Sequence, residues 1–360
     1  MIPVTKAYLP NKEKYQSYVD RIFQSGWLTN NGSLLQELER RLADYLGVKN
    51  IILVANGSFA LQLAYKALAL EGEVITTPFS FAATTSTLAW EGLKPVFADI
   101  NSETFNIDPA QIEAQINPNT SAIVPVHVFG NPCDVDAIQA IADKHKLKVV
   151  YDAAHAFGSE YKGQSVLNYG DISTLSFHST KLFHTIEGGA VITSDDELAK
   201  KIRTMINFGI TSATTIETVG TNAKMNEFEA AMGLCVLDDI DYIREQRANI
   251  WQKYMQSLAS HFTIQKWNEY GRNNHAYAPI LFNNEKQLLQ AEAKLKENDI
   301  LARRYFYPSL DTLEYLDTKQ ICKNSRDVAS RIMCIPIFPG LKVNEKEKVI
   351  KILKEVANNV

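Results

Sequence analysis

From residue 51 onward, short apolar runs rich in β-branched residues alternate with segments that have helical character. The runs span residues 51–55, 74–77, 95–100, 122–128, 148–151, 172–177 and 189–193. Such alternation predicts an α/β fold whose central sheet is mostly parallel and carries helices on both faces. Ligands of such sheets bind at the carboxyl ends of the strands. Catalytic residues are therefore expected directly after these runs.

The rest of the chain predicts a second, smaller unit. A long helical region from about residue 225 to 260 is followed by strands at 276–282 and 333–338 and by helices at 285–298 and 344–357. A chain of 360 residues with 46% hydrophobic side chains can bury two cores. We expect a large domain of residues 1–245, including the N-terminal segment, and a smaller C-terminal α/β domain of residues 246–360.

Charge and apolar content exclude several kinds of partner. The net charge is −4, and no run of Lys and Arg provides a basic surface, so nucleic acid is not an expected partner. The N-terminus lacks the pattern of a signal peptide, and no apolar stretch approaches the roughly 20 residues that span a bilayer. We expect a cytoplasmic protein with no membrane contact.

Neither the cysteines nor the histidines form a recognisable metal motif. The four cysteines are widely spaced and suit a reducing compartment as small core or surface side chains. Five histidines fall within 60 residues, but no pair has the spacing of a zinc site: His127, His145, His155, His178 and His184. No bound metal is expected, and ordinary polar contacts account for these rings.

One lysine occupies a position where its amine can be reactive. Lys181 lies in the polar turn between the run 172–177 and the double glycine Gly188-Gly189. Desolvation in such a turn lowers the pKa of the amine and makes it available for a Schiff base with an aldehyde. For a lysine considered alone, a solvated surface charge is the ordinary alternative.

Three further segments place polar or aromatic side chains at strand ends. Asp152 ends the run 148–151, where it faces the ligand side of the sheet or serves as a helix N-cap. Gly57 and Ser58 begin a helix whose free N–H groups can hold a phosphate, although an N-cap is the alternative there. Phe81 follows the run 74–77 and either covers a flat ligand or packs in the core.

In order and spacing, these segments resemble the DegT/DnrJ/EryC1/StrS sugar aminotransferases, which have the fold type I of pyridoxal-phosphate (PLP) enzymes. The central pattern is S-F-H-x-x-K-x(5)-E-G-G at 176–189, preceded by D-A-A-H at 152–155. Further similar segments lie at 25–29, 126–132 and 303–308, so the resemblance covers nearly the whole chain. One departure is Asn56, where many members have serine.

The resemblance implies roles for the cofactor-binding residues. Lys181 forms the Schiff base and then carries the proton between substrate and cofactor, while Asp152 pairs with the pyridine nitrogen. Phe81 stacks on the ring, and His155 lies near the ring hydroxyl. The resemblance also implies a homodimer with shared sites, in which the phosphate is bound by Gly57, Ser58, Ser176 and, from the partner subunit through the motif G-x-N-x-K-M at 220–225, Asn222.

The substrates that the resemblance implies are L-glutamate and a nucleotide-linked keto-sugar. The Glu187-Gly188-Gly189 sequence favours amination at C4, and the nearest pattern is that of an enzyme that converts dTDP-4-keto-6-deoxyglucose to dTDP-4-amino-4,6-dideoxyglucose. Amination at C3 of a 3-keto isomer and a UDP- or GDP-linked substrate are the alternatives. Substrate contacts are expected from Glu187, Lys224, Arg303, Tyr305, Phe306 and Tyr307, each with a solvated or core position as the alternative.

A protein of a different class, a PLP or sugar-nucleotide binding regulator without turnover, would have the same fold. Such a protein has no need for Lys181, Asp152, Ser176 and Asn222 together. A branch of the family that dehydrates sugars has histidine in place of the lysine, so Lys181 favours amino transfer.

Overall fold

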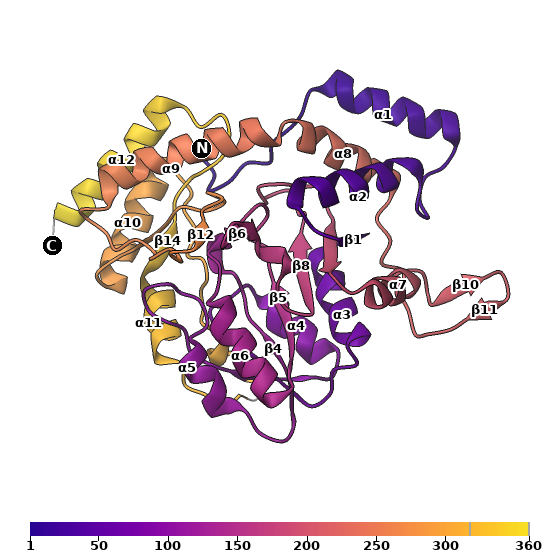
Figure 1. The fold of residues 1–360 in the computed structure, drawn as a ribbon. Coiled ribbons are helices and arrows are strands. Elements are labelled where there is room, and N and C mark those ends of the chain that lie inside the picture. Colours follow the sequence, from indigo (N-terminus) through magenta and orange to yellow (C-terminus); the bar gives the residue numbers. More distant parts are fainter. Residues whose placement is uncertain (317, 359–360) are drawn as a thin grey trace.

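The computed structural model describes residues 1–316 and 318–358, and its centre is a seven-stranded sheet (Figure 1). The strand order is β1-β9-β8-β5-β4-β2-β3. Four neighbouring pairs are parallel, whereas β9 runs antiparallel to both β1 and β8. The strands are β1 (Asn50–Val54), β2 (Glu73–Thr76), β3 (Lys94–Phe97), β4 (Thr120–Val124), β5 (Lys148–Asp152), β8 (Ile172–Ser176) and β9 (Gly189–Thr193). The predicted mostly parallel sheet is confirmed.

Helices surround this sheet and form a second group near the C-terminus. They are α1 (Lys12–Ser25), α2 (Ser33–Leu46), α3 (Gly57–Ala67), α4 (Ala82–Trp90), α5 (Pro109–Ile112), α6 (Val135–His145), α7 (Asp196–Met205), α8 (Glu227–Asp238), α9 (Ile240–Leu258), α10 (Glu285–Glu297), α11 (Lys323–Arg331) and α12 (Val343–Asn358). Short strands form smaller sheets, among them β12 (Gly271–Arg272) with β6 (Glu160–Tyr161) and β7 (Gln164–Ser165), and β13 (Pro279–Leu281) with β14 (Ile332–Cys334).

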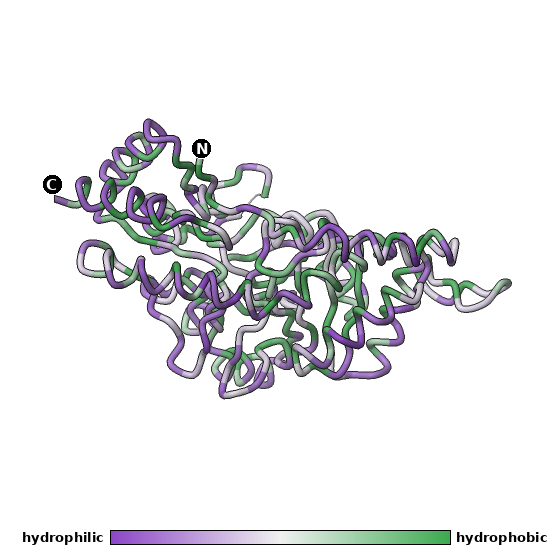
Figure 2. Tube along the Cα trace, turned by 90° about the horizontal axis from the view of Figure 1, so that it is seen from above, coloured by the Kyte–Doolittle hydropathy of each residue, from purple (hydrophilic) through white to green (hydrophobic). Residues whose placement is uncertain are grey.

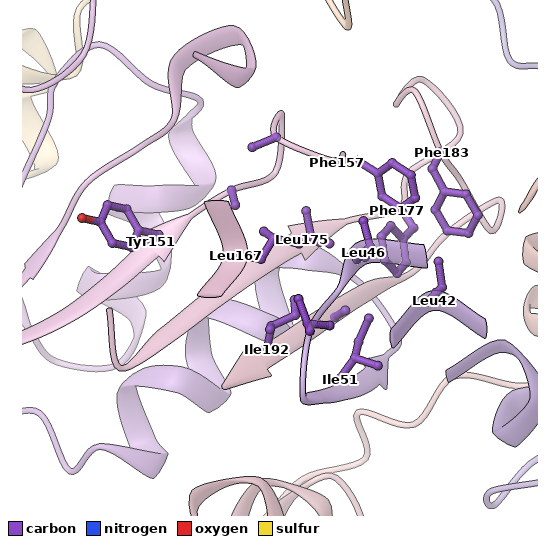
Figure 3. Close-up of a cluster of buried hydrophobic side chains, with 14 of the residues drawn as sticks. Leu42, Leu46, Ile51, Tyr151, Phe157, Leu167, Leu175, Phe177, Phe183 and Ile192 are labelled. Atoms are coloured by element: carbon purple, nitrogen blue, oxygen red, sulfur yellow. The ribbon is translucent and has the colours of Figure 1, made fainter. Parts of the chain in front are cut away.

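Side chains of the strands alternate between two buried layers. In β1, Ile51 and Leu53 join the core that contains the leucines of α2, and Ile52 and Val54 join the core that contains the apolar side of α3. Figure 3 shows part of the first core, with Leu42 of α2 beside the sheet. The period of two that defines a strand thus buries both faces of β1, which is why its sequence is apolar throughout.

Several predicted boundaries shift for local reasons. The run 122–128 yields a strand that ends at Val124, because Pro125 has no N–H for the ladder and residues 128–130 form a turn of 3₁₀ helix. The helical region 225–260 consists of two helices that meet at Asp239. The strands expected at 276–282 and 333–338 are shorter, with only three paired residues each.

A separate hydrophobic core lies in the C-terminal part and includes the start of the chain. Residues of α9, α10 and α12 form half of it, and Ile2 packs among them. The N-terminal segment is held by a parallel bridge from Ile2 to Ile300 and by a hydrogen bond from Ile337 N–H to the carbonyl oxygen of Val4. Figure 1 shows the N-terminus beside α9. Helix α9 runs through residue 245, where the sequence predicts the domain boundary. That boundary remains a prediction.

A hairpin projects from the body of the molecule. It consists of β10 (Ile210–Ser212) and β11 (Thr215–Ile216), and both views show it extending away from α7 (Figures 1 and 2). Four large apolar side chains in or beside it are exposed: Phe208, Ile210, Ile216 and Val219. The sequence patterns did not predict this arm.

Within the described residues, no helix is both long and apolar enough to cross a membrane. In residues 1–316 and 318–358, no group of three or more His, Cys, Asp and Glu side chains is arranged to hold a metal ion. All four cysteines are buried and unbridged, so they occupy the core rather than the surface.

Candidate active site

A cavity of about 280 Å³ opens at the carboxyl ends of the parallel strands. The segments that follow β1, β2, β5 and β8 form its walls, and residues 303–306 close it from the C-terminal part. This is the edge of the sheet where the sequence predicts the site. Eleven of the candidate residues line the cavity: Gly57, Ser58, Phe81, Asp152, His155, Ser176, Lys181, Glu187, Arg303, Tyr305 and Phe306.

Three candidate residues lie outside this cavity. Asn222 is bridged to Asn207 on the far side of β1, and Lys224 donates to Asn207 Oδ1 at 3.0 Å. Lys224 lines a separate cavity of about 200 Å³. Tyr307 is half exposed and packs against Arg304, whose guanidinium carbon lies 3.6 Å from the ring centroid. A single chain therefore does not bring Asn222 or Lys224 to Lys181.

The start of α3 forms an anion cradle. Asn56 is the N-cap, and its side chain accepts from Phe59 N–H at 2.9 Å, which leaves the hydroxyl of Ser58 free for a ligand. A Cβ added to Gly57 would lie 2.8 Å from Cβ of Ser176, and one added to Gly189 would lie 2.8 Å from the backbone nitrogen of Gly57. Glycine at both positions lets the turn, β8 and β9 approach closely, and Gly57, Ser58 and Ser176 line the same cavity.

Asp152 is a buried carboxylate, and no cation in residues 1–316 and 318–358 forms an ion pair with it. It is 6% exposed; Oδ2 accepts from Thr84 Oγ1 at 2.7 Å, and Oδ1 accepts from Ala154 N–H at 3.1 Å. The pKa of Asp152 is raised above its ordinary value, because the effect of burial outweighs the two hydrogen bonds and the charge of Lys181, which lower it. No helix follows β5, so the N-cap alternative is wrong. A buried carboxylate with only neutral donors is suited to a cationic ligand atom.

The pKa of the Lys181 amine is lowered, which favours its neutral form. Burial lowers its pKa from the ordinary 10.5 to about 8; Asp152 opposes this shift and Arg303 adds to it. The amine lies 3.4 Å from the hydroxyl of Tyr277, which comes from the C-terminal part of the chain. At pH 8 about half of such amines are unprotonated and nucleophilic. The surface-charge alternative for Lys181 is wrong.

His155 is a neutral ring in an aromatic wall. It is 5% exposed, and burial, together with the charge of Lys181, lowers its pKa well below the ordinary value. Its Nδ1 accepts from Phe129 N–H at 3.3 Å, which places the ring proton on Nε2. Tyr277 and Phe306 pack around it, with ring centroids 4.4 Å and 5.4 Å away. Nε2–H is thus a donor suited to an anionic oxygen.

The other side of the cavity presents an exposed ring and charged groups. Phe81 precedes α4 and is 50% exposed, so it is not a core residue and its ring is free to cover a flat ligand. Glu187 lies 3.5 Å from Nε2 of His178. The guanidinium carbon of Arg303 lies 4.4 Å from the centroid of Tyr305, and within the described part of the chain no carboxylate forms an ion pair with it.

These residues fit pyridoxal phosphate, the cofactor that the resemblance implies. The cradle at Gly57 accepts a phosphate, the unpaired carboxylate of Asp152 accepts a protonated ring nitrogen, and the amine of Lys181 suits an aldehyde. The tight approach of Gly57 to Ser176 is the observation that tests this fit, because any larger side chain would fill the cradle.

Two residues contact the pair Asp152 and Lys181 and are not among the site residues predicted from the sequence. Thr84 donates to Asp152 although 68 residues separate them, and Tyr277 lies beside Lys181 although 96 residues separate them. Thr84 lies three residues after Phe81, the predicted site residue that follows the run 74–77, and this position is a weak signal. Tyr277 belongs to a segment that periodicity identified only as a strand, and that pattern gives no sign of a contact with Lys181.

Comparisons with known proteins agree with this geometry. The model of the DegT/DnrJ/EryC1/StrS aminotransferase family matches residues 10–354. The chain is 44% identical to the dTDP-4-amino-4,6-dideoxy-D-glucose transaminase of Shigella dysenteriae over 98% of both chains. It is 40% identical to the Escherichia coli enzyme of that name, over 98% of this chain and 97% of the other.

A solved structure shows the same fold. The crystal structure of DesI in the presence of its TDP-sugar product superposes with a TM-score of 0.93 at 35% identity, covering 99% of this chain and 93% of DesI. The predicted PLP fold type I is thereby confirmed. The chain belongs to the DegT/DnrJ/EryC1/StrS aminotransferase family and is a PLP-dependent nucleotide-sugar aminotransferase.

Proposed function

We propose that this enzyme transfers the amino group of L-glutamate to C4 of dTDP-4-keto-6-deoxyglucose and forms dTDP-4-amino-4,6-dideoxyglucose. The observation that carries the proposal is the full-length similarity to two transaminases named for that product. The Glu187-Gly188-Gly189 sequence supports amination at C4.

The residues of the cavity divide the chemistry among them. Bound PLP supplies an aldehyde that takes up the amino group and a ring that withdraws electrons from the reacting carbon. Lys181 holds the cofactor through Nζ, and that atom then takes and returns a proton at the reacting carbon. With PLP bound, Asp152 would keep a proton on the ring nitrogen, and Nε2–H of His155 would be the donor for the ring oxygen. Phe81 would shield one face of the ring from water.

The remaining residues suit an anionic substrate. Arg303 provides a guanidinium at the wall of the cavity next to Tyr305, and guanidinium groups bind carboxylates and phosphates with two parallel hydrogen bonds. Tyr305 and Phe306 offer aromatic surface for the sugar or the base. Glu187 accepts hydrogen bonds from sugar hydroxyls at the same wall.

Product analysis tests the substrate. Incubation with L-glutamate and dTDP-4-keto-6-deoxyglucose is expected to yield 2-oxoglutarate and an amino sugar whose nitrogen NMR places on C4. The matched controls are the isomeric 3-keto sugar and the UDP- and GDP-linked 4-keto sugars, for which kcat/KM is expected to be at least about 10-fold lower. Amination at C3, or equal use of another nucleotide, contradicts the substrate proposal and leaves the roles of Lys181 and Asp152 untouched.

We infer that the enzyme acts as a homodimer with two shared sites. Asn222, which the resemblance assigns to the cofactor phosphate, and Lys224, a candidate cation for the sugar diphosphate, both lie outside the cavity of their own chain. The projecting hairpin exposes Ile216 and Val219 at 71% and 81%, which is apolar surface available for a second copy. A twofold dimer would present these segments to the opposite cavity.

Mixing two defective variants tests this arrangement. If Asn222 acts across the interface, Lys181→Ala and Asn222→Ala subunits form hybrid dimers in which one site contains both wild-type residues. Re-equilibrated mixtures are expected to regain about a quarter of wild-type activity, because half of the dimers are hybrids with one intact site. Each variant alone is the control, and sedimentation gives the oligomeric state. Absence of recovery, or a fully active monomer, refutes the shared site.

A further inference from the structure

Helix α4 contains three threonines, and their hydroxyls donate to different kinds of acceptor. The hydroxyl of Thr85 donates to the carbonyl oxygen of Ala82 at 3.2 Å, and that of Thr87 donates to Ala83 at 2.7 Å. Such bonds to a carbonyl three or four residues back are usual for helical threonine. Thr84 instead donates across to Oδ2 of Asp152 at 2.7 Å.

The contact between Thr84 and Asp152 is buried and favours the ionised form of Asp152. Thr84 is 0% exposed and Asp152 is 6% exposed, so water does not replace the hydroxyl. A hydroxyl has a single proton, and an ionised carboxylate has only acceptors, so the pair stabilises the ionised form of Asp152. The second carboxylate oxygen is oriented by Ala154 N–H. These two donors fix the plane of the carboxylate.

We propose that Thr84 is a positioning residue for the amino-transfer reaction: its hydroxyl holds Asp152 ionised and oriented toward the cofactor's ring nitrogen. This inference rests on the proposed role of Asp152. The same turn of α4 carries Phe81 at its N-cap, three residues before Thr84. One helical turn therefore sets both the ring that covers the cofactor and the partner of the carboxylate beneath it.

The surroundings of Asp152 allow its titration to be isolated. The titratable groups that face it are Lys181 in the turn after β8, Tyr65 of α3 and Tyr305 of the C-terminal part, and His155 follows it in its own loop. Burial raises the pKa of Tyr305 to about 12 and raises that of Tyr65 further, so both phenols stay protonated. Among the groups that face Asp152, His155 is therefore the one whose ionisation must be told apart from that of Asp152 in the acid range.

The test compares Thr84→Val, which keeps the shape and removes the hydroxyl, with Thr84→Ser, which keeps the hydroxyl. In Thr84→Val the acid limb of kcat is expected to move up by about one pH unit, because the ionised carboxylate loses a donor. We expect kcat to fall about 10- to 100-fold with little change in KM for glutamate. Thr84→Ser is expected to stay within about threefold of wild type.

A spectroscopic measurement separates this effect from general damage. With ¹⁵N-labelled PLP, the ring nitrogen of Thr84→Val is expected to shift toward the value of unprotonated pyridine, because the less stabilised carboxylate holds the shared proton more tightly. This signal reads the ring nitrogen itself and so distinguishes Asp152 from His155. Thr85→Val is the matched control, since it removes a buried hydroxyl one residue away that binds only its own helix; it is expected to leave the signal unchanged.

An unchanged acid limb and ring signal in folded Thr84→Val overturn the proposal, as does an equal shift in Thr85→Val. If Thr84→Val does not fold, Thr84→Cys replaces it, because the weaker thiol donor must give a smaller shift in the same direction. An unshifted Thr84→Cys then also overturns it. Asp152→Asn keeps the two hypotheses apart: normal rates in that variant refute the role of Asp152, whereas loss of rate there with a normal Thr84→Val refutes Thr84 alone.

Discussion

Lys181→Ala is expected to lower amino transfer by at least about 10,000-fold, because it removes both the amine that holds the cofactor and the group that moves the proton. The purified wild-type protein is expected to be yellow, and the variant is expected to lose the absorbance of the covalent bond to lysine. The measurement is steady-state turnover together with the absorption spectrum. Borohydride reduction followed by peptide mass spectrometry then identifies the modified residue.

Lys162→Ala is the control for Lys181, because Lys162 is a half-exposed lysine that pairs with Asp136 on the surface. Its spectrum and turnover are expected to match wild type. A pyridoxyl adduct on any lysine other than Lys181 contradicts the assignment. The pKa of about 8 adds a second measurement: the rate at which apoenzyme takes up PLP is expected to rise up to about pH 8 and level off above it, since only the neutral amine reacts.

Asp152→Asn is expected to bind PLP and to lose about 1,000-fold or more in turnover, since an amide cannot keep a proton on the ring nitrogen. The substitution preserves the shape of a side chain that is nearly fully buried, so cofactor affinity is expected to change far less than kcat. Turnover, cofactor titration and thermal unfolding of the same preparation separate the chemical defect from loss of folding.

Asp171→Asn is the matched control for Asp152. Asp171 directly precedes β8, at the edge of the sheet opposite the cavity, where it pairs with Lys148. Its removal is expected to change turnover by no more than about twofold, because an exposed ion pair contributes little. Turnover of Asp152→Asn within tenfold of wild type would show that Asp152 does not support the ring nitrogen.

The sequence alone was sufficient for the sheet and for the identity of the residues at its ligand edge. Strand β1 is buried on both faces and is therefore apolar throughout, and such a run can be recognised from the sequence alone. Because parallel strands place their carboxyl ends at one edge, Gly57, Asp152 and Lys181 were expected together, and one cavity brings them together. The position of each residue directly after a strand is a local feature of the sequence, and it is enough to place these residues at one edge of the sheet.

Only the tertiary structure decided which side chains support those residues. Thr84 reaches Asp152 and Tyr277 reaches Lys181 because helix and strand packing aligns segments 68 and 96 residues apart, and no local pattern encodes those directions. The same holds for Ile2 in the C-terminal core. Hydrogen-bond partners and packing neighbours depend on the relative placement of whole elements, which periodicity does not specify.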